Sequence, residues 1–286
     1  MSINCCLLGF GRIGKIHFDN IMFESNYNKW NLSYIVEIES KINSIEKHLE
    51  KYFKKPVVTH DFSKVLEDPD ISCIFICSPT HMHFTNIMES LSKGKHVFCE
   101  KPIDENLENI KKCYELAKEK NLHLFCAFNR RFDNDISMLK TNIHSVGKIH
   151  QLISITRDYP YPNVDFLKMS SGLFNDCALH DIDFINWIFN DTPISVYVSA
   201  ISSKPDQISG GQLDDSSITM EYKNSSRAFI YCSRISNTYD QRIEIFGEKG
   251  NLTVDNPYGK VETFTKYGRN ISFKQRYENS YKNELI

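Results

Sequence analysis

The chain has 286 residues, of which 41% are apolar and 24% are charged, a composition typical of globular proteins with a large buried core. Lysine and arginine together number 34 and aspartate and glutamate 36, so the formal charge of -2 supplies no cationic field for nucleic acid or anionic lipid. The length excludes a single helix or peptide module and favours about two domains.

The sequence also carries no sign of a membrane or secreted protein. No run is apolar and long enough to cross a bilayer, and the amino end lacks the basic region of a signal peptide. The 9 cysteines are odd in number, contain no C-x-x-C pair and fall mostly inside apolar runs, which favours reduced core thiols. We therefore expect a cytoplasmic protein with no membrane segment, no disulfide framework and no metal site.

Over residues 1–127, short apolar runs alternate with amphipathic stretches that carry charge. The apolar runs predict strands at Ile3–Gly9, Leu32–Ile38, Pro56–Val58, Ile71–Cys77, His96–Cys99 and Leu122–Ala127. The stretches between them predict helices at Ile13–Glu24, Lys41–Tyr52, Phe62–Leu66, His83–Ser92 and Leu107–Lys120. Apolar strands alternating with helices are typical of a parallel sheet covered on both faces, so we expect a doubly wound α/β domain of the Rossmann type, which binds dinucleotides.

The pattern changes from about residue 128. One helix is predicted at Leu173–Phe189, and alternating runs follow at Ser195–Ile201, Ser217–Tyr222, Arg227–Ser233 and Gln241–Phe246. These runs are close enough in sequence to pair as antiparallel neighbours, so residues 128–286 are expected to form an α+β domain with an open, largely antiparallel sheet. No low-complexity linker separates the two regions, and we expect them to share a ligand cleft.

Gly9, Gly11 and Gly14 form a G-x-G-x-x-G motif between a predicted strand and a predicted helix. In that context the first glycine makes the tight turn, the second lets a pyrophosphate approach the backbone, and the third packs helix against strand. The motif predicts a dinucleotide site, with a purely structural glycine turn as the alternative.

Glu37 ends the second predicted strand, at about the spacing from the glycine loop at which an acid meets the adenosine ribose. A carboxylate there accepts hydrogen bonds from both ribose hydroxyls and repels a 2′-phosphate, so NAD is favoured over NADP. A solvated strand end is the alternative, and Lys41 nearby would soften the repulsion.

Two further groups of residues carry acid–base chemistry. Lys101, beside Glu100, follows the fifth predicted strand at the sheet edge where ligands bind in this architecture. Asp176 and His180 are four residues apart and share one face of the predicted helix, and an imidazole beside a carboxylate is a tunable base near neutral pH. Taken alone, the segment with Glu100 and Lys101 is more often an ordinary loop. Asp176 and His180, taken alone, are more often a buried polar pair.

Together these segments resemble the Gfo/Idh/MocA family of nicotinamide-dependent sugar oxidoreductases, from Ile3 to about Asn283. Within the family, Thr156–Pro162 and Tyr239–Arg242 look most like the inositol 2-dehydrogenase branch. The other matching pieces are, in order, Gly9–Gly14, Ser78–His83, Gly94–Pro102, Phe128–Asp133 and the helix with Asp176 and His180.

The resemblance implies a role for each matching residue. Lys101 would position the substrate hydroxyl and relay its proton, His180 would be the general base, and Asp176 would hold the histidine and bind a neighbouring hydroxyl. Along the cofactor it implies Gly9, Phe10, Gly11, Arg12, Ile13, Gly14, Glu37, Ser78, Thr80, His83, Glu100 and Lys101. Against the polyol it implies Lys101, Asp176 and His180 with Arg131, Asp158, Tyr159 and Tyr239, and for these last four an ordinary surface or packing role is the alternative.

The carboxyl end departs from the family, whose members usually run a few dozen residues beyond the segment resembling Gln275–Ile286. A segment as short as Tyr277–Ile286 is a marginal helix in water, so we expect it to be held by docking its apolar residues Tyr277, Tyr281 and Leu285. The departure puts stability, oligomer contacts and turnover at risk.

The sequence thus predicts an NAD-dependent dehydrogenase that moves hydride from a ring carbon of a cyclic polyol, myo-inositol at C2, to nicotinamide. By resemblance it is a homo-oligomer, dimer or tetramer, assembled through the open face of the second sheet. The alternatives are the same chemistry on another sugar or a nucleotide-linked sugar, and a catalytically silent NAD-binding protein. The short carboxyl end favours the silent protein, whereas intact Lys101, Asp176 and His180 oppose it.

Overall fold

The structure is a computed structural model that describes residues 2–23, 29–164, 167, 170–203, 213–256 and 273–285. It divides into two compact units, each described by itself below. The first runs from the amino end to Phe128 and includes the residues from Tyr281 on, and the second is Asn129–Ser280.

The described part of the first unit contains a 6-stranded sheet of order β3-β2-β1-β4-β5-β6, with every neighbouring pair parallel. This is the predicted doubly wound sheet, in which the order reverses direction between β1 and β4. The strands are β1 (Ile3–Leu8), β2 (Trp30–Val36), β3 (Val57–Thr59), β4 (Cys73–Ile76), β5 (His96–Glu100) and β6 (Leu124–Ala127).

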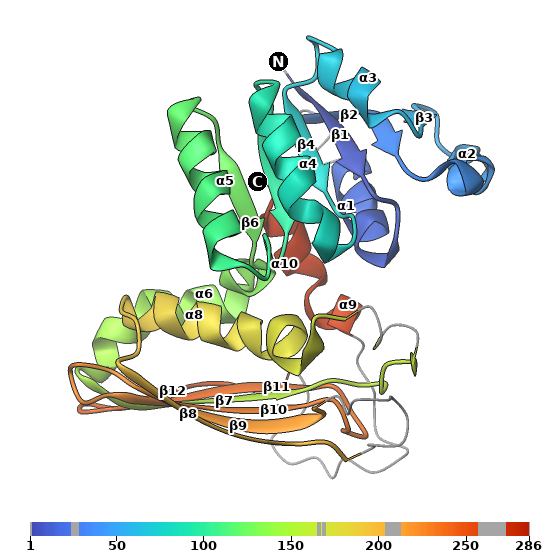
Figure 1. The fold of residues 1–286 in the computed structure, drawn as a ribbon. Helices are drawn as coiled ribbons and strands as arrows, with labels where there is room; N and C mark the ends of the chain where they lie inside the picture. Colours follow the sequence, from blue (N-terminus) through green and yellow to red (C-terminus); the bar gives the residue numbers. More distant parts are fainter. Residues whose placement is uncertain are drawn as a thin grey trace. The chain divides into compact units, whose positions relative to one another are not determined.

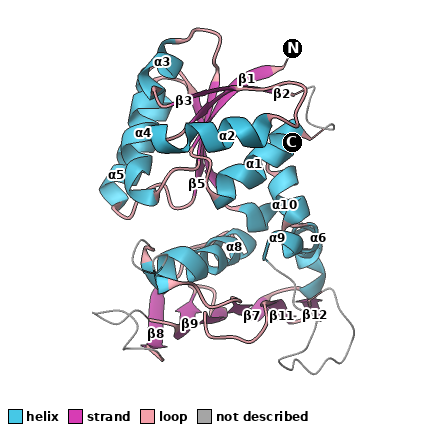
Figure 2. Ribbon diagram, turned by 90° about the vertical axis from the view of Figure 1, so that its right-hand side faces the viewer, coloured by secondary structure: helices cyan, strands magenta, loops and turns pink. Residues whose placement is uncertain are grey.

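Helices cover both faces of this sheet, with α1 and α2 on one side and α3, α4 and α5 on the other (Figure 2). Because both faces are covered, β4 is buried along its whole length, which explains its uninterrupted apolar sequence. The helices are α1 (Arg12–Met22), α2 (Ile42–Leu49, after the 3₁₀ turn η2, Glu39–Lys41), α3 (Phe62–Glu67), α4 (Thr80–Ser92) and α5 (Leu107–Glu119). The last residue of the helix predicted at Ile13–Glu24 lies outside the described residues.

The last described residues pack on the first unit. The short helix α10 (Glu278–Asn283) lies within the segment expected to dock. Tyr281 is 7% exposed and its ring meets the His17 imidazole edge-on at 5.7 Å, while Leu285 is 3% exposed and accepts a 2.9 Å hydrogen bond from the Trp30 indole. Tertiary contacts therefore hold a segment too short to be helical alone. Ile286 lies outside the described residues.

The second unit holds another 6-stranded sheet among its described residues, of order β12-β11-β7-β10-β9-β8. The predicted antiparallel pairing holds for β8 with β9 and for β9 with β10, but β10 and β11 are not neighbours. β7 lies between them, parallel to β10 and antiparallel to β11. The strands are β7 (Ile149–Arg157), β8 (Ser195–Ile201), β9 (Asp215–Glu221), β10 (Arg227–Ser233), β11 (Asp240–Gly247) and β12 (Asn251–Val254).

β7 was not predicted, because part of its buried face is polar and part of its exposed face is apolar. The buried face carries Leu152, Ser154 and Thr156, whereas Ile153 and Ile155 on the opposite face are part-exposed. Both hydroxyls donate to one oxygen of the buried Asp181, at 2.5 and 2.7 Å. Since the polar residues are paired inside, alternation of apolar and polar residues no longer marks the buried face.

Helices of the second unit lie along one face of its sheet, and no described helix of this unit covers the other face (Figure 1). The predicted helix at Leu173–Phe189 is a π-helical turn, η5 (Phe174–Ala178), that continues into α8 (Leu179–Phe189). The other elements here are the 3₁₀ turns η3 (Asn129–Phe132) and η4 (Ile143–Val146) and the helices α6 (Asn134–Asn142) and α9 (Phe273–Arg276).

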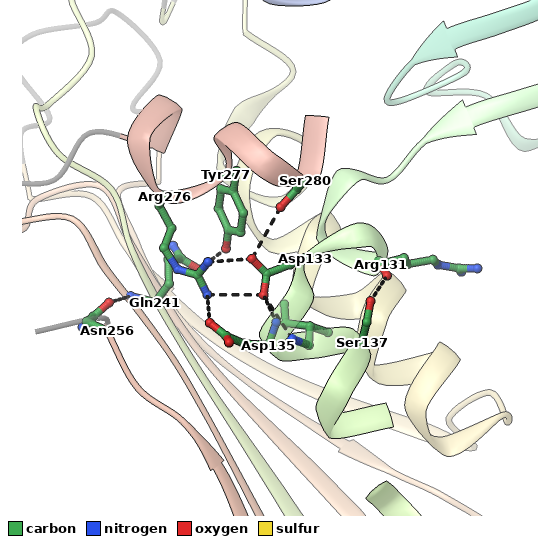
Figure 3. Close-up of polar contacts among 10 residues, drawn as sticks. Arg131, Asp133, Asp135, Ser137, Gln241, Asn256, Arg276, Tyr277 and Ser280 are labelled. Carbon is green, nitrogen blue, oxygen red and sulfur yellow. Dashed lines mark hydrogen bonds and ion pairs between the residues drawn. The ribbon is translucent and has the colours of Figure 1, made fainter. Parts of the chain in front are cut away.

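Asp133 joins two segments of this unit that are far apart in sequence (Figure 3). One carboxylate oxygen caps α6 by accepting from the backbone N–H groups of Asp135 and Ile136, at 3.1 and 3.0 Å. The other accepts from Arg276 at 2.6 Å, so the helix cap also anchors α9. Arg276 and Asp133 are both buried in this pair.

All 9 cysteines are free thiols, and 7 of them are buried. Burial raises the pKa of Cys73 to about 12, so this thiol stays protonated at neutral pH. The cysteines are therefore core residues, as their apolar surroundings in the sequence indicate.

Candidate active site

The glycine loop of the first unit has the shape that the motif predicts. Gly9 has a φ of +98°, and a Cβ on it would lie 2.6 Å from the Cys77 carbonyl oxygen. A Cβ on Gly14 would lie 2.1 Å from the Gly9 carbonyl oxygen. Both positions therefore accept only glycine, the first for conformation as well as space.

Gly11 differs from these two, because a Cβ there would meet nothing within 4 Å. Gly11 is also the N-cap of α1, and the first turn of that helix contains no acidic residue. An open backbone position at a helix amino end without negative charge suits an anionic group such as a pyrophosphate. Arg12 and Ile13 open the helix, and the Phe10 ring packs inward, edge-on to Phe18 at 5.3 Å.

Glu37 is tied to this loop. One carboxylate oxygen accepts from the Phe10 backbone N–H at 3.0 Å and the other from the Ile38 N–H at 3.0 Å. Burial alone would raise the pKa of Glu37, but these two hydrogen bonds and Lys41, at 3.5 Å, bring it below its ordinary value. Glu37 is thus an ionised carboxylate that directly follows β2 and shapes the glycine loop.

His83 connects the two loops that leave the carboxyl ends of β4 and β5. It is 1% exposed, with Nδ1 2.7 Å from the Pro102 carbonyl oxygen and Nε2 2.8 Å from the Ser78 carbonyl oxygen. The Ser78 hydroxyl accepts from Asn86 at 3.0 Å, and Thr80 opens α4. Ser78 and His83 therefore belong to the framework that holds the Lys101 loop.

Glu100 is held at the end of β5. Its Oε1 lies 2.6 Å from Nε2 of the buried His17, and its Oε2 accepts from the Lys101 backbone N–H at 3.3 Å. The Lys101 side chain is half-buried, at the carboxyl edge of the sheet, where ligands bind in doubly wound folds.

In the second unit, Asp176 lies in the π-helical turn η5 and His180 in the first turn of α8. Both side chains are half-buried, and π-helical turns are frequent at functional sites. Asp176 Oδ2 accepts from the Ser170 hydroxyl and lies 3.2 Å from the buried Arg234 guanidinium.

Two of the predicted polyol residues lie at the same end of the second sheet. Asp158 follows β7 and accepts a 3.1 Å hydrogen bond from Cys177, the residue after Asp176. Tyr239 immediately precedes β11 and is 8% exposed, with its ring edge-on to Tyr277 at 6.5 Å. Tyr159, next to Asp158, is 38% exposed.

Arg131, the remaining candidate, has a carboxylate partner within its own unit. Its guanidinium donates two hydrogen bonds to Asp183, at 2.6 and 2.7 Å, and lies 5.9 Å from the Trp187 ring. Asp183 and Trp187 continue the helix face that carries Asp176 and His180, so the ion pair fixes Arg131 to that face.

A buried ion pair holds the helix that carries His180, and sequence reasoning missed it. Asp181 is fully buried and accepts from the Arg130 guanidinium at 2.9 Å as well as from the two hydroxyls of β7. The sequence does place Asp181 on the same helix face as Phe184, Ile185 and Ile188. A carboxylate on an apolar face needs a buried partner, so this position could have indicated the ion pair.

The described residues contain neither a metal-binding cluster nor a membrane-spanning helix. No group of three or more His, Cys, Asp or Glu side chains in this part of the chain is arranged to hold a metal ion. No helix among the described segments has the length and apolarity needed to cross a bilayer.

Comparison with protein families gives two matches. Residues 3–128 match a model described as the oxidoreductase family with an NAD-binding Rossmann fold, and residues 144–253 match the GFO/IDH/MocA C-terminal domain. The two matches together cover most of the chain.

Individual relatives extend over nearly the whole chain. It is 35% identical to an uncharacterised oxidoreductase of Bacillus subtilis, covering 98% of this chain and 83% of the relative. It is 31% identical to the myo-inositol 2-dehydrogenase of Thermotoga maritima, covering 98% and 85%. Among solved structures, scyllo-inositol dehydrogenase of Lactobacillus casei with bound NAD(H) and scyllo-inositol superposes with a TM-score of 0.85 at 27% identity, covering 100% of this chain and 87% of that one.

Proposed function

The chain belongs to the Gfo/Idh/MocA oxidoreductase family, and on that premise we propose that it is an NAD-dependent dehydrogenase of a cyclic polyol, myo-inositol at C2. The observation that carries the proposal is the pairing of Asp176 and His180 on one helix face, in a chain whose other unit holds a dinucleotide loop. The relatives named for inositol oxidation support the choice of substrate.

The acid–base residues fit alcohol oxidation. Loss of hydride from a hydroxyl-bearing carbon requires removal of the hydroxyl proton, and His180 is the base that accepts it. Lys101 holds the same hydroxyl and relays the proton, and Asp176 orients the histidine and binds a neighbouring hydroxyl. NAD, when bound, supplies the hydride acceptor.

The loop of the first unit suits that cofactor. Gly11 leaves room for the pyrophosphate, and Glu37, kept ionised by its hydrogen bonds, accepts from the adenosine ribose. Because an ionised carboxylate repels a 2′-phosphate, NAD binds in preference to NADP. Ser78, Thr80, His83 and Glu100 lie along the nicotinamide half, with His83 acting through the two loops that it joins.

Polyol recognition falls to polar residues of the second unit. Asp158 follows β7 and Tyr239 precedes β11, both at the sheet end beside η5. Arg131 is held on the helix face of His180 by its ion pair with Asp183. Carboxylate, phenol and guanidinium groups offer both donors and acceptors to a ring of hydroxyls. Tyr159 completes the proposed set.

The protein is proposed to act as a homo-oligomer, a dimer or tetramer in the cytoplasm. The second sheet exposes large apolar side chains that a partner subunit would cover, at Tyr197, Ile201, Tyr231 and Phe246. Light scattering at micromolar concentration checks this, and a monomer at that concentration contradicts it.

A spectrophotometric screen tests the function. Purified protein is mixed with NAD and with each inositol isomer or hexose in turn, and NADH is followed by absorbance. Reduction with myo-inositol above all others supports the proposal, and preference for another sugar corrects the substrate. NAD binding without reduction on any polyol overturns the proposed activity in favour of a silent binding protein.

A further inference from the structure

Asp176 contacts a buried arginine that no sequence motif singled out. Arg234 is 1% exposed, and it is the largest side chain among the fully buried ones in the described residues. Its Nη2 lies 3.2 Å from Asp176 Oδ2, and the Asp176 side chain is itself 22% exposed. A guanidinium removed from water needs a carboxylate partner, and Asp176 supplies one.

The strand register fixes where Arg234 lies. β7 and β10 run parallel with Arg157 opposite Ser233, so the next residues, Asp158 and Arg234, leave the sheet side by side. The Asp158 N–H donates to the Ser233 carbonyl at 2.8 Å, and the Arg234 N–H donates to the Asp214 carbonyl at 2.8 Å. The arginine backbone is therefore held by the sheet.

The contacts to Asp176 converge on one atom. Oδ2 receives the Ser170 hydroxyl and the Arg234 guanidinium, and the guanidinium is also 3.5 Å from the Ser170 hydroxyl oxygen. Burial opposes the charge of Arg234, but Cys177, Asp176 and Asp158 around it raise its pKa above the ordinary value, so it remains a cation. A permanent cation and a hydroxyl on the same oxygen select one orientation of the carboxylate.

We infer that Arg234 is a positioning residue of the active site: it holds the Asp176 carboxylate in one orientation, one helical turn before His180. The inference rests on the proposed function, because Asp176 orients the general base there. It adds to that function a residue that has no assigned contact with the polyol or the cofactor and that acts through Asp176.

Arg234→Met removes the charge and keeps much of the volume. We expect kcat to fall by about tenfold to a hundredfold, the scale at which misplacement of a reacting group acts, with the Kd for NAD changed less than about twofold. Arg276→Met is the matched control, because Arg276 is another buried arginine of this unit and pairs with Asp133 instead.

The decisive measurement repeats both substitutions in an Asp176→Asn background. If Arg234 acts through Asp176, then Arg234→Met changes the remaining kcat of the Asp176→Asn protein by less than about twofold. Arg276→Met should change kcat by the same factor with and without Asp176→Asn. An Arg234→Met penalty that is equally large in both backgrounds overturns the inference. So does an unchanged kcat in the single variant.

Unfolding measurements separate this inference from the proposed function. If no polyol supports NAD reduction by the wild-type protein, the proposed function fails. The Tm values of the wild type, Arg234→Met, Asp176→Asn and the Asp176→Asn/Arg234→Met double variant still report the contact between the two residues. A Tm loss from Arg234→Met that shrinks in the Asp176→Asn background supports the contact, and an unchanged loss overturns it. If Arg234→Met does not fold, Arg234→Lys is measured in both backgrounds by the same criteria.

Discussion

In the first unit, the candidate cofactor site is made of backbone: two glycines leave no room for a side chain, a third leaves a space open, and a helix amino end faces it. In the second unit, the candidate substrate site is made of side chains such as Asp158 and Asp176, which leave different elements and are held by hydrogen bonds and ion pairs. The first kind of site depends on shape and the second on charge, so they respond to different changes.

The largest expected effect lies in the side-chain site. His180→Ala removes the proposed base, and turnover should fall by about two to four powers of ten, the usual contribution of a positioned acid–base group. NAD affinity, measured by fluorescence titration, should stay nearly unchanged, because the cofactor loop is built without this residue. Turnover at the wild-type rate would show that another residue is the base.

The backbone site is tested by two substitutions of the same size. Gly14→Ala places a methyl group 2.1 Å from a backbone oxygen, so both Tm and NAD binding should fall, with a loss of stability of about 1–3 kcal/mol or more. Gly11→Ala meets nothing within 4 Å and its φ of -74° suits alanine, so Tm should change little.

NAD affinity should nevertheless fall in Gly11→Ala, because the methyl group fills the space where the pyrophosphate approaches the backbone. Calorimetry of both variants with and without NAD makes the comparison. Equal loss of Tm in the two variants would mean that the loop is not held as the structure has it.

These two sites were predictable from the sequence to different degrees. The glycine loop, Glu37 and the parallel sheet follow local rules, in which spacing and apolar runs specify the backbone directly. Asp176 and His180 were predictable as a pair because one helix carries both. Arg234 was not, because its partner Asp176 lies in η5, 58 residues earlier in the chain, and reaches the end of β10 only through tertiary packing.

The failure at β7 has the same origin. Ser154 and Thr156 occupy its buried face because Asp181, on a helix that follows in the chain, accepts hydrogen bonds from their hydroxyl groups there. A rule based on apolar alternation cannot include a partner from another element. Buried polar contacts such as these make a strand harder to predict from its sequence. They also hold the side chains of the candidate substrate site in place.

The choice between NAD and NADP should change by a smaller factor. It depends on Glu37, a side chain that is part of the backbone-built cofactor site. The wild-type protein should bind NAD more tightly than NADP, and Glu37→Ser should narrow that difference by removing the repulsion of a 2′-phosphate. Because Glu37 also accepts from the Phe10 and Ile38 N–H groups, NAD affinity itself should drop.

Glu37→Gln is the matched control, since it removes the charge but keeps the length of the side chain. It should narrow the NAD–NADP difference as Glu37→Ser does, with a smaller drop in NAD affinity. Titration of each variant with both cofactors checks this, and tighter NADP binding by the wild-type protein would contradict the assignment of Glu37.

The smallest expected effect concerns pH and the stability of the second unit. Asp240 is 4% exposed and accepts from Arg157, Arg242 and Asn256, at 2.7 to 2.9 Å. Burial by itself would raise the pKa of Asp240, but these partners together hold it below the ordinary value. A lowered folded-state pKa stabilises the protein above the unfolded value of about 3.9, and the contribution is lost as pH falls through the folded value.

Asp240→Asn should therefore lower the free energy of unfolding by about 1–3 kcal/mol at neutral pH, the scale of a hydrogen bond to a charged group. The difference from wild type should shrink as pH falls below about 4, where the wild-type carboxyl also becomes neutral. Asp135→Asn is the control, because that carboxylate is 58% exposed and 3.9 Å from its partner Arg276, and an exposed pair contributes little. Denaturant titrations at several pH values compare the three proteins. If the difference in unfolding free energy between Asp240→Asn and wild type stays the same below about pH 4, the hydrogen-bond geometry of Asp240 stabilises the protein and its charge does not.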